Sequence, residues 1–279
     1  MSVGFAVFVA ALLGLLVGSF LNVLILRLPV MLERGWRDEA RATLELPPEE
    51  AEAFDLVRPG SRCGACGHAI AWWENIPVLS WLLLRGRCSA CGTRISPRYP
   101  LVEIAGAVLA AALVALHGVS AWTAGGVVLA WGLLALALID FDTTLLPDGI
   151  TLPLLWLGLL LHAWLDPGFL PQAVTGAAIG YASLWCVYQG FRLLTGKEGM
   201  GFGDFKLFAM LGAWFGAMAL LPIILLSAIC GAVIGLALQA TGALQRGRPM
   251  PFGPFLAAAG LLALFLGPQR LVGWVLGGV

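Results

Sequence analysis

Long apolar runs dominate this chain, and they predict helices that cross a membrane. Residues 3–26 carry no charge. A helix needs about 20 such residues to cross about 30 Å of hydrocarbon, because it rises about 1.5 Å per residue. Further apolar runs lie near 100–117, 121–139, 149–164, 170–194, 204–217, 218–241 and 253–276. The predicted fold class is an all-α polytopic membrane protein with about eight transmembrane helices.

A polar insert at residues 27–98 interrupts this pattern. It holds ten of the 16 Lys and Arg residues and nine of the 16 Asp and Glu residues. We therefore expect a first transmembrane helix over residues 1–26, a loop domain over 27–98 and a second transmembrane domain over 99–279. The overall composition agrees, because 60% hydrophobic and 11% charged residues are far from the roughly 45–50% and 25% of soluble domains.

The distribution of cations predicts the orientation of the chain. Arg27 is the first cation and follows the first apolar run. The positive-inside rule then puts the N-terminus outside and the 27–98 loop in the cytoplasm. A secretory signal peptide would begin with basic residues, so we expect the first helix to be retained. With eight spans, fifteen of the 16 basic residues fall on the cytoplasmic side.

Two aspartates at the ends of apolar runs are the strongest candidates for chemistry. A charged side chain at the centre of a membrane helix costs about 2.5–3.5 kcal/mol on insertion scales, so such residues usually serve a function. Asp140 closes one predicted span and Asp204 opens another on the same cytoplasmic face. Two carboxyl groups that share a proton can activate water and polarise a carbonyl, as in aspartyl hydrolases. Gly201 and Gly203 would allow positive φ angles or a close neighbour beside Asp204.

Other polar residues near this pair are expected to have simpler roles. Asp142 lies two positions from Asp140, so on a helix it points in a different direction and should be solvated. We expect Asp148 to cap the next helix, and Lys197 and Glu198 to form a solvated turn.

Four cysteines in the loop predict a metal site. Cys63 and Cys66 form one C-x-x-C pair, and Cys88 and Cys91 form a second. This spacing is typical of zinc ribbons, and a closed set of four thiolates makes zinc structural. A redox or disulfide role is the alternative, although a cytoplasmic location argues against disulfides. His68 should then be a surface residue.

Short motifs spread over nearly the whole chain resemble those of the type IV prepilin leader peptidases. They are Gly18-Ser19-Phe20-Leu21-Asn22-Val23, the cysteine pairs, Trp73-Glu74-Asn75-Ile76-Pro77, Arg98-Tyr99-Pro100-Leu101-Val102-Glu103, Ile139-Asp140-Phe141-Asp142, Leu146-Pro147-Asp148, Lys197-Glu198-Gly199-Met200-Gly201-Phe202-Gly203-Asp204 and Pro251-Phe252-Gly253-Pro254-Phe255.

The resemblance implies two reactions at a bacterial inner membrane. One is cleavage of prepilins or pseudopilins after a glycine, at the cytoplasmic membrane face, with Asp140 and Asp204 as catalytic residues and the Lys197-to-Asp204 motif around the second. The other is N-methylation of the new N-terminus, with S-adenosylmethionine as donor. The family's Gly-Lys linked to methyl transfer corresponds to Gly86-Arg87, where arginine keeps the charge but changes the donor geometry.

Two alternatives stay open from the residues alone. A carboxylate-based transporter would need polar residues along several spans, and few are present beyond the pair. A membrane-anchored zinc-ribbon scaffold without catalysis would tolerate Asn at both aspartates. Membrane lipid and pilin precursors are the expected partners, nucleic acid is not, and the sequence leaves the oligomeric state open.

Overall fold

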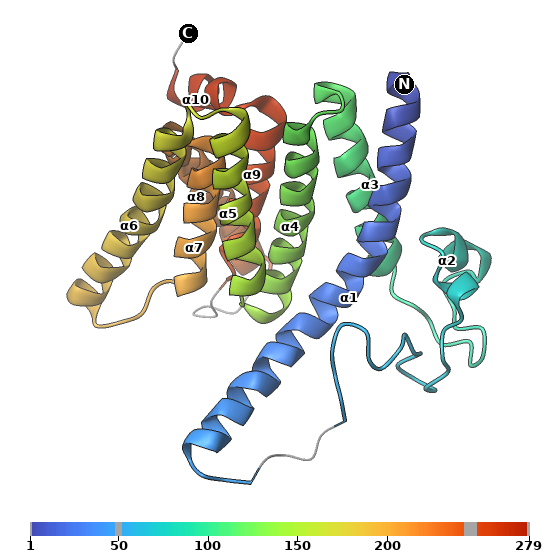
Figure 1. Ribbon diagram of the computed structural model, residues 1–279. Helices are drawn as coiled ribbons and strands as arrows, with labels where there is room; N and C mark the ends of the chain where they lie inside the picture. Colours follow the sequence, from blue (N-terminus) through green and yellow to red (C-terminus); the bar gives the residue numbers. More distant parts are fainter. Residues whose placement is uncertain (1, 48–51, 243–249, 278–279) are drawn as a thin grey trace. The chain divides into compact units, whose positions relative to one another are not determined.

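A computed structural model describes residues 2–47, 52–242 and 250–277, and these residues form a helical protein (Figure 1). The chain divides into an N-terminal unit, Met1–Gly118, and a C-terminal unit, Val119–Val279. The N-terminal unit contains α1 (Val3–Thr43), η1 (Trp72–Asn75), α2 (Leu79–Leu83) and α3 (Arg98–His117). The C-terminal unit contains α4 (Ala121–Thr143), α5 (Asp148–Leu165), α6 (Leu170–Thr195), α7 (Phe202–Phe215), α8 (Ala217–Ala240), α9 (Gly253–Leu266) and α10 (Pro268–Leu276).

Five of the described helices are long and apolar enough to cross a membrane: α1, α3, α4, α5 and α8. The α9–α10 pair makes a sixth candidate if it is counted as one span, although its two helices are bent by 112°. This protein is therefore a multi-pass membrane protein, but the expected eight spans are not confirmed. Helix α7 has 14 residues and reaches only about 21 Å. Helix α6 is long enough but carries Gln172, Gln189 and Arg192.

The run expected at 253–276 is broken rather than continuous. Gly267 has φ of 84°, a left-handed conformation that ends α9, and Pro268 begins α10. A left-handed glycine followed by proline cannot continue a helix in the same direction. Helix α10 consequently lies crosswise to α9 at the end of the C-terminal unit (Figure 1).

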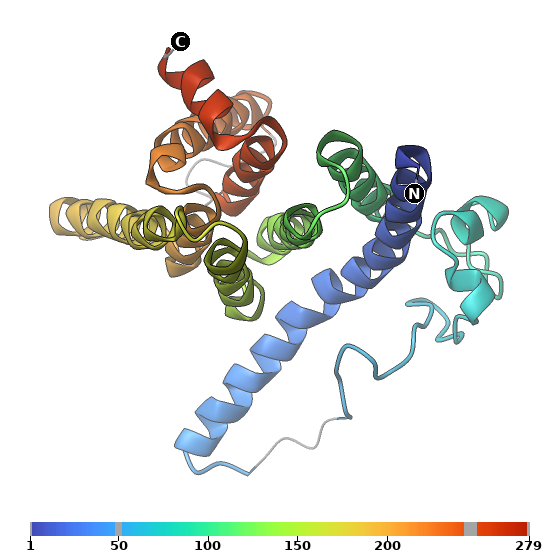
Figure 2. The same ribbon diagram turned by 45° about the horizontal axis from the view of Figure 1, so that its top comes forward.

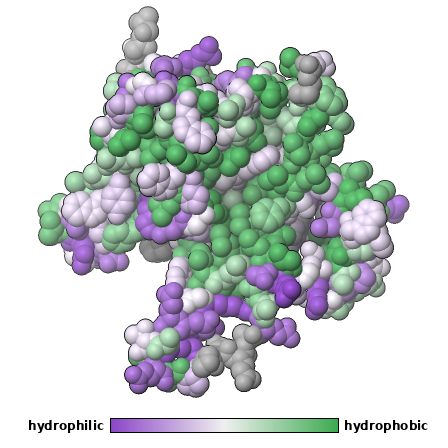
Figure 3. Space-filling view, in the orientation of Figure 1, coloured by the Kyte–Doolittle hydropathy of each residue, from purple (hydrophilic) through white to green (hydrophobic). Residues whose placement is uncertain are grey.

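Helix α1 continues well beyond residue 26, where the apolar run ends. Residues 27–43 extend it as a polar helix, with a 3.7 Å ion pair between Glu33 and Arg37. Glu, Arg and Ala are good helix formers in water, so the helix outlasts its membrane-like pattern. Figure 3 shows hydrophilic residues gathered on this distal part of α1. Most of the expected 242–252 loop lies outside the described residues.

Small residues bring α1 and α3 into close contact. Gly14 and Gly18 are four residues apart on α1 and face Gly106 and Glu103 on α3. A Cβ atom on Gly18 would lie 2.6 Å from the Cα atom of Glu103, so only glycine fits there. Small residues at this spacing let membrane helices pack backbone to backbone. Figures 1 and 2 both show α1 and α3 side by side.

The core of the C-terminal unit is built around α7. Residues Leu207–Phe215 of this helix are all buried. Gly176 of α6 and Gly212 of α7 lie so close that a Cβ atom on either would meet the backbone of the other. Trp214 of α7 donates its indole N–H to the Leu154 carbonyl of α5 at 2.8 Å. The neighbours of α7 thus fix it along its length, and its first turn carries Asp204.

Candidate active site and metal centre

The two predicted aspartates lie at opposite kinds of helix end. Asp140 is in the last turn of α4, and Asp204 is the third residue of α7. Only 4% of Asp140 and 8% of Asp204 is exposed. Thr144, with φ of 56°, ends α4 and donates its N–H to the Asp140 carbonyl at 2.8 Å. The start of α7 presents free N–H groups that favour an anion in its first turn.

Leu146 links the surroundings of both aspartates. A Cβ atom on Gly203, beside Asp204, would lie 2.7 Å from the Leu146 Cβ atom. A Cβ atom on Gly253 would lie 3.2 Å from Leu146 Cδ2 and 2.6 Å from Asp140 Oδ2. The charge of Asp140 also acts on Asp204. The fold therefore brings together two carboxyl groups that are 64 positions apart in the chain.

Their hydrogen bonding differs in a way that suits different tasks. Asp140 Oδ2 accepts the backbone N–H of Gly253 at 2.9 Å. Asp204 Oδ1 is buried and has no hydrogen-bond partner among the described residues. Most buried polar atoms are hydrogen-bonded, so Asp204 Oδ1 is an acceptor available to water or to a substrate. Gly253 is a residue of this site that the sequence alone does not identify, although it lies in the Pro-Phe-Gly-Pro-Phe motif.

Four polar residues near the aspartate pair lie on the surface or at a helix start. Asp142 is exposed, as expected, and so are Lys197 and Glu198. The expectation that Asp148 caps α5 is wrong, because Pro147 takes that position and Asp148 is the first helical residue. Its carboxylate instead binds Lys206 Nζ of α7 at 2.6 Å, so it ties the start of α5 to α7.

The two glycines before Asp204 serve packing more than backbone freedom. Gly201 has φ of −79° and caps α7, while Gly203 is helical. Neither adopts the positive φ that their small size would permit. The expected close neighbour is present at Gly203, where the glycine hydrogen faces the Leu146 side chain. At Gly201 a Cβ atom would make only an ordinary 3.8 Å contact.

The four cysteines of the loop gather into one cluster. The sulfur atoms of Cys63, Cys66, Cys88 and Cys91 all lie within 4.8 Å of one another, and no disulfide joins them. Cys63 and Cys91 have their sulfur atoms 3.8 Å apart. A tetrahedral zinc with bonds of about 2.3 Å to sulfur needs sulfur atoms about 3.8 Å apart. The donor set and its spacing therefore fit a closed four-thiolate metal site.

The backbone forms two matching turns at this cluster. Gly67 and Gly92, both with φ near 70°, donate to the carbonyls of Cys63 and Cys88 at 2.9 Å. One isolated β-bridge closes each turn, Arg62 to Ala69 and Arg87 to Arg94. Backbone N–H groups of Cys66 and Ala65 lower the pKa of the Cys63 thiol. At Cys63 the loop thus favours the thiolate form that metal binding requires.

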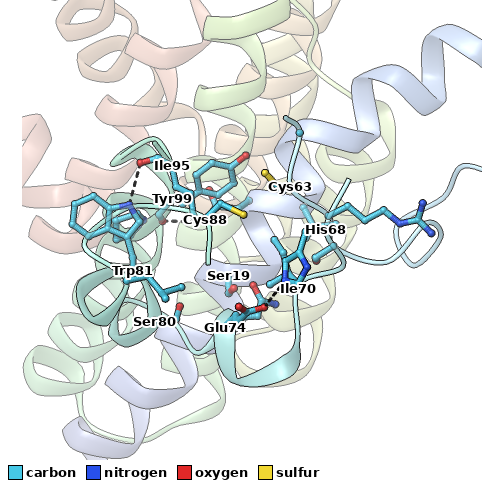
Figure 4. A pocket seen from close by; sticks show the side chains of 18 of the residues that line it. Ser19, Cys63, His68, Ile70, Glu74, Ser80, Trp81, Cys88, Ile95 and Tyr99 are labelled. Carbon is cyan, nitrogen blue, oxygen red and sulfur yellow. Dashed lines mark hydrogen bonds and ion pairs between the residues drawn. The ribbon is translucent and has the colours of Figure 1, made fainter. Parts of the chain in front are cut away.

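A cavity of about 330 Å³ lies between this loop and the facing sides of α1 and α3 (Figure 4). Its aromatic wall includes Trp81, whose indole N–H donates to the Ile95 carbonyl at 3.2 Å. His68 lies on the opposite side in Figure 4 and contacts Glu74 at 3.3 Å. Polar groups of the wall also include Ser19, Asn22 and Glu103. Its size falls in the range of small-molecule sites, about 300–1,000 Å³.

The two residues predicted for methyl transfer lie next to this cavity rather than in its wall. Gly86 is buried with φ of 64°, and a Cβ atom there would lie 2.8 Å from the Trp81 ring. Arg87 is exposed. The positive φ and the contact with Trp81 therefore explain why a glycine stands at position 86. The Arg87 side chain has no hydrogen bond or ion pair in the described structure.

Comparisons with known proteins cover both units. The profile of the bacterial peptidase A24 N-terminal domain matches residues 12–117, and that of the type IV leader peptidase family matches residues 127–236. A prepilin leader peptidase/N-methyltransferase of Stutzerimonas stutzeri is 55% identical over 262 residues, which cover 93% of this chain and 90% of that protein.

Two other organisms contain similar proteins of the same description. The relative from Pseudomonas aeruginosa is 54% identical over 260 residues, 92% of this chain and 89% of that protein. The relative from Neisseria gonorrhoeae is 48% identical over 276 residues, 97% of this chain and 94% of that protein. No solved structure matches this chain.

Proposed function

Because this chain belongs to the type IV leader peptidase family, we propose that Asp140 and Asp204 are the catalytic pair with which it cleaves prepilin leaders. It is a membrane-bound prepilin peptidase and N-methyltransferase. One observation carries the assignment of residues. Two buried carboxyl groups lie at helix ends beside Leu146, and one oxygen of Asp204 has no partner in the described structure.

The hydrogen bonds suggest how the pair divides the work. The Gly253 N–H holds Asp140 Oδ2 in place, and Asp204 Oδ1 is free to accept a hydrogen bond from water. In cleavage, one carboxylate takes a proton from the attacking water while the protonated partner donates to the scissile carbonyl. The new amine then takes up a proton as the peptide bond breaks. The products are a leader carboxylate and a pilin with a free α-amino group.

The same proposal includes the side of the membrane. Asp140 is near the C-terminal end of a candidate span, so the site is close to a membrane boundary where water can reach it. The abundance of Arg in residues 27–98 supports a cytoplasmic loop, an outside N-terminus and a cytoplasmic site in the bacterial inner membrane. A basic leader would then stay on the cytoplasmic side while it is cut.

We assign the second reaction, methyl transfer, to the N-terminal unit, which would provide both a structural metal site and a site for the methyl donor. Zinc would be held by Cys63, Cys66, Cys88 and Cys91, whose closed arrangement leaves no open position for catalysis. S-adenosylmethionine would supply the methyl group, and the adjacent cavity has a suitable size and an aromatic wall at Trp81. Gly86 supports that wall from behind. Cleavage belongs to the helices after residue 99 and needs no metal in this scheme.

The assignment of the pair is tested by Asp140→Asn and Asp204→Asn in the purified protein, with prepilin conversion followed by mass. Asn keeps the size of the side chain and an oxygen that can accept the Gly253 N–H. We expect each variant to lose about 100-fold or more of the cleavage rate, as for removal of a general acid or base. Asp142→Asn, on the exposed side of the same helix, is the matched control and should cleave normally. Folded Asn variants that cleave within a few-fold of wild type would overturn the assignment.

A further inference from the structure

Glu103 is a buried carboxylate that the cleavage reaction does not use. It lies in the second turn of α3, is 8% exposed and forms part of the cavity wall in the N-terminal unit. Its Oε2 atom accepts the backbone N–H of Val78 at 2.7 Å, and Ser19 of α1 lines the same cavity. The close approach of α1 at Gly18 brings Ser19 to this position.

Among the described residues, no cation pairs with Glu103. Arg27 also borders the cavity, but its guanidinium donates to the Asp55 carbonyl at 3.0 Å and lies over the Phe54 ring. The other acid of the wall, Glu74, has a histidine partner at 3.3 Å. A buried carboxylate without a cation is costly, and one in a membrane-length helix usually has a function. The cavity therefore has a place for a positively charged group.

We propose that Glu103 binds the α-amino group of the cleaved pilin and so forms the acceptor subsite for methyl transfer. This inference rests on the proposed function, which creates such an amine and then methylates it. The aspartate pair is at the end of a candidate span, so the new N-terminus is produced near a membrane boundary. Glu103 is five residues from the start of its own candidate span, about 7.5 Å along the helix, and thus also near a membrane boundary.

A second acceptor lies near Glu103. Asn22 of α1 is 7% exposed, and its amide nitrogen donates to the Tyr99 carbonyl at 3.0 Å and to the Gly18 carbonyl at 3.3 Å. This leaves the carbonyl oxygen of Asn22 as an acceptor, because both donors of the amide are turned to backbone. Two acceptors and nearby aromatic rings suit a primary ammonium, which is attracted both to carboxylates and to ring faces.

The chemistry of methyl transfer gives the carboxylate a task. The ammonium first loses a proton to water, and the nitrogen lone pair then attacks the methyl carbon of a methylsulfonium donor. The N–C bond forms as the C–S bond breaks, with the electron pair of that bond left on sulfur. Positive charge thus moves from sulfur to nitrogen. A carboxylate hydrogen-bonded to that nitrogen stabilises the charge as it develops.

A binding experiment on the full chain in detergent tests the subsite without catalysis. The probe is a short peptide that copies the mature pilin N-terminus, compared with the same peptide acetylated at its amine. We expect wild type to bind the free amine at least about tenfold more tightly, the worth of one hydrogen bond to a charged group. Glu103→Gln keeps the size of the side chain and its acceptor for Val78, and should bind both peptides alike. Retained discrimination in this variant would overturn the proposal.

Methylation of the free-amine peptide separates this inference from the proposed function. Wild type should methylate it, Glu103→Gln should be at least about tenfold slower, and both should cleave prepilin at the same rate. Glu74→Gln, the other cavity carboxylate, should still discriminate between the two peptides. If Glu103→Gln instead loses affinity for S-adenosylmethionine and keeps peptide discrimination, Glu103 binds the donor's ammonium and the acceptor assignment is wrong. Lack of methylation by wild type would overturn the methyltransferase function itself.

Discussion

The backbone N–H of Gly253 donates a hydrogen bond to Asp140 Oδ2 at 2.9 Å, across 113 positions of the chain. This contact places the start of α9 directly against the end of α4. It also leaves no room for a side chain, since a Cβ atom on Gly253 would lie 2.6 Å from the same oxygen. Gly253 therefore positions the Asp140 carboxyl group through its backbone.

Gly253→Ala should abolish most cleavage while leaving the protein folded. The added methyl group must displace the Asp140 carboxyl group from its place, and small shifts in a positioned catalytic group cost large factors in rate. Cleavage by mass and thermal unfolding check this together. Gly231→Ala is the matched control, because its Cβ atom would make an ordinary 3.4 Å contact with Phe255. Normal cleavage by Gly253→Ala would contradict the positioning role.

Gly203→Ala should destabilise the C-terminal unit, and a second substitution should relieve it. The new methyl group would overlap the Leu146 side chain, whose Cβ atom is 2.7 Å away. Overpacking of this kind costs about 1–3 kcal/mol. Leu146→Gly in the same chain removes this Cβ atom, so the double variant should recover part of the unfolding temperature and of the cleavage rate. Equal defects in the single and double variants would show that Leu146 is not the obstacle.

Gly18→Leu should impair methylation and spare cleavage. The larger side chain would push α1 away from the Glu103 backbone and so alter the cavity that Ser19 and Glu103 line. Gly4→Leu on the same helix is the control, because a Cβ atom there would meet nothing within 4 Å. Both activities can be measured on one sample of prepilin by mass. A Gly18→Leu protein that methylates as wild type does would argue against a cavity built on this contact.

Removal of zinc should damage methylation before cleavage. Binding to four thiolates contributes folding energy to small metal sites, and here two of the ligands, Cys63 and Cys88, also border the cavity. Chelation, or Cys88→Ser, should lower the zinc content, the methylation rate and the unfolding temperature. Cys186→Ser removes a thiol on α6 and should change none of these. A cleavage rate that followed zinc occupancy in folded protein would contradict the structural role.

Much of the helical framework could be predicted from the sequence because lipid-facing helices require long apolar runs. The expected runs near 121–139 and 149–164 correspond closely to α4 and α5. The polar half of α1 was missed because a helix in water needs no such run. The bend at Gly267 was missed because an apolar run has the same composition whether it is straight or broken.

The site was only partly visible for a related reason. Asp140 and Asp204 stood out because each is a charge beside an apolar run, but Gly253 has no chemistry of its own until the fold brings its N–H to Asp140. Glu103 carried a usable signal, since it is a single acid inside a membrane-length run. The same argument, an acid in or beside a membrane-length run, identified the aspartates. Only the cavity in the structure indicates what Glu103 could bind.

One intact-mass assay tests most directly whether cleavage depends on the aspartate pair and not on the Glu103 cavity. Prepilin and already cleaved pilin are each incubated with S-adenosylmethionine and either Asp204→Asn or Glu103→Gln. We predict that Asp204→Asn leaves prepilin uncut but methylates cleaved pilin, whereas Glu103→Gln cuts prepilin and leaves the product unmethylated. Normal cleavage by folded Asp204→Asn, or loss of cleavage in folded Glu103→Gln, would contradict the account.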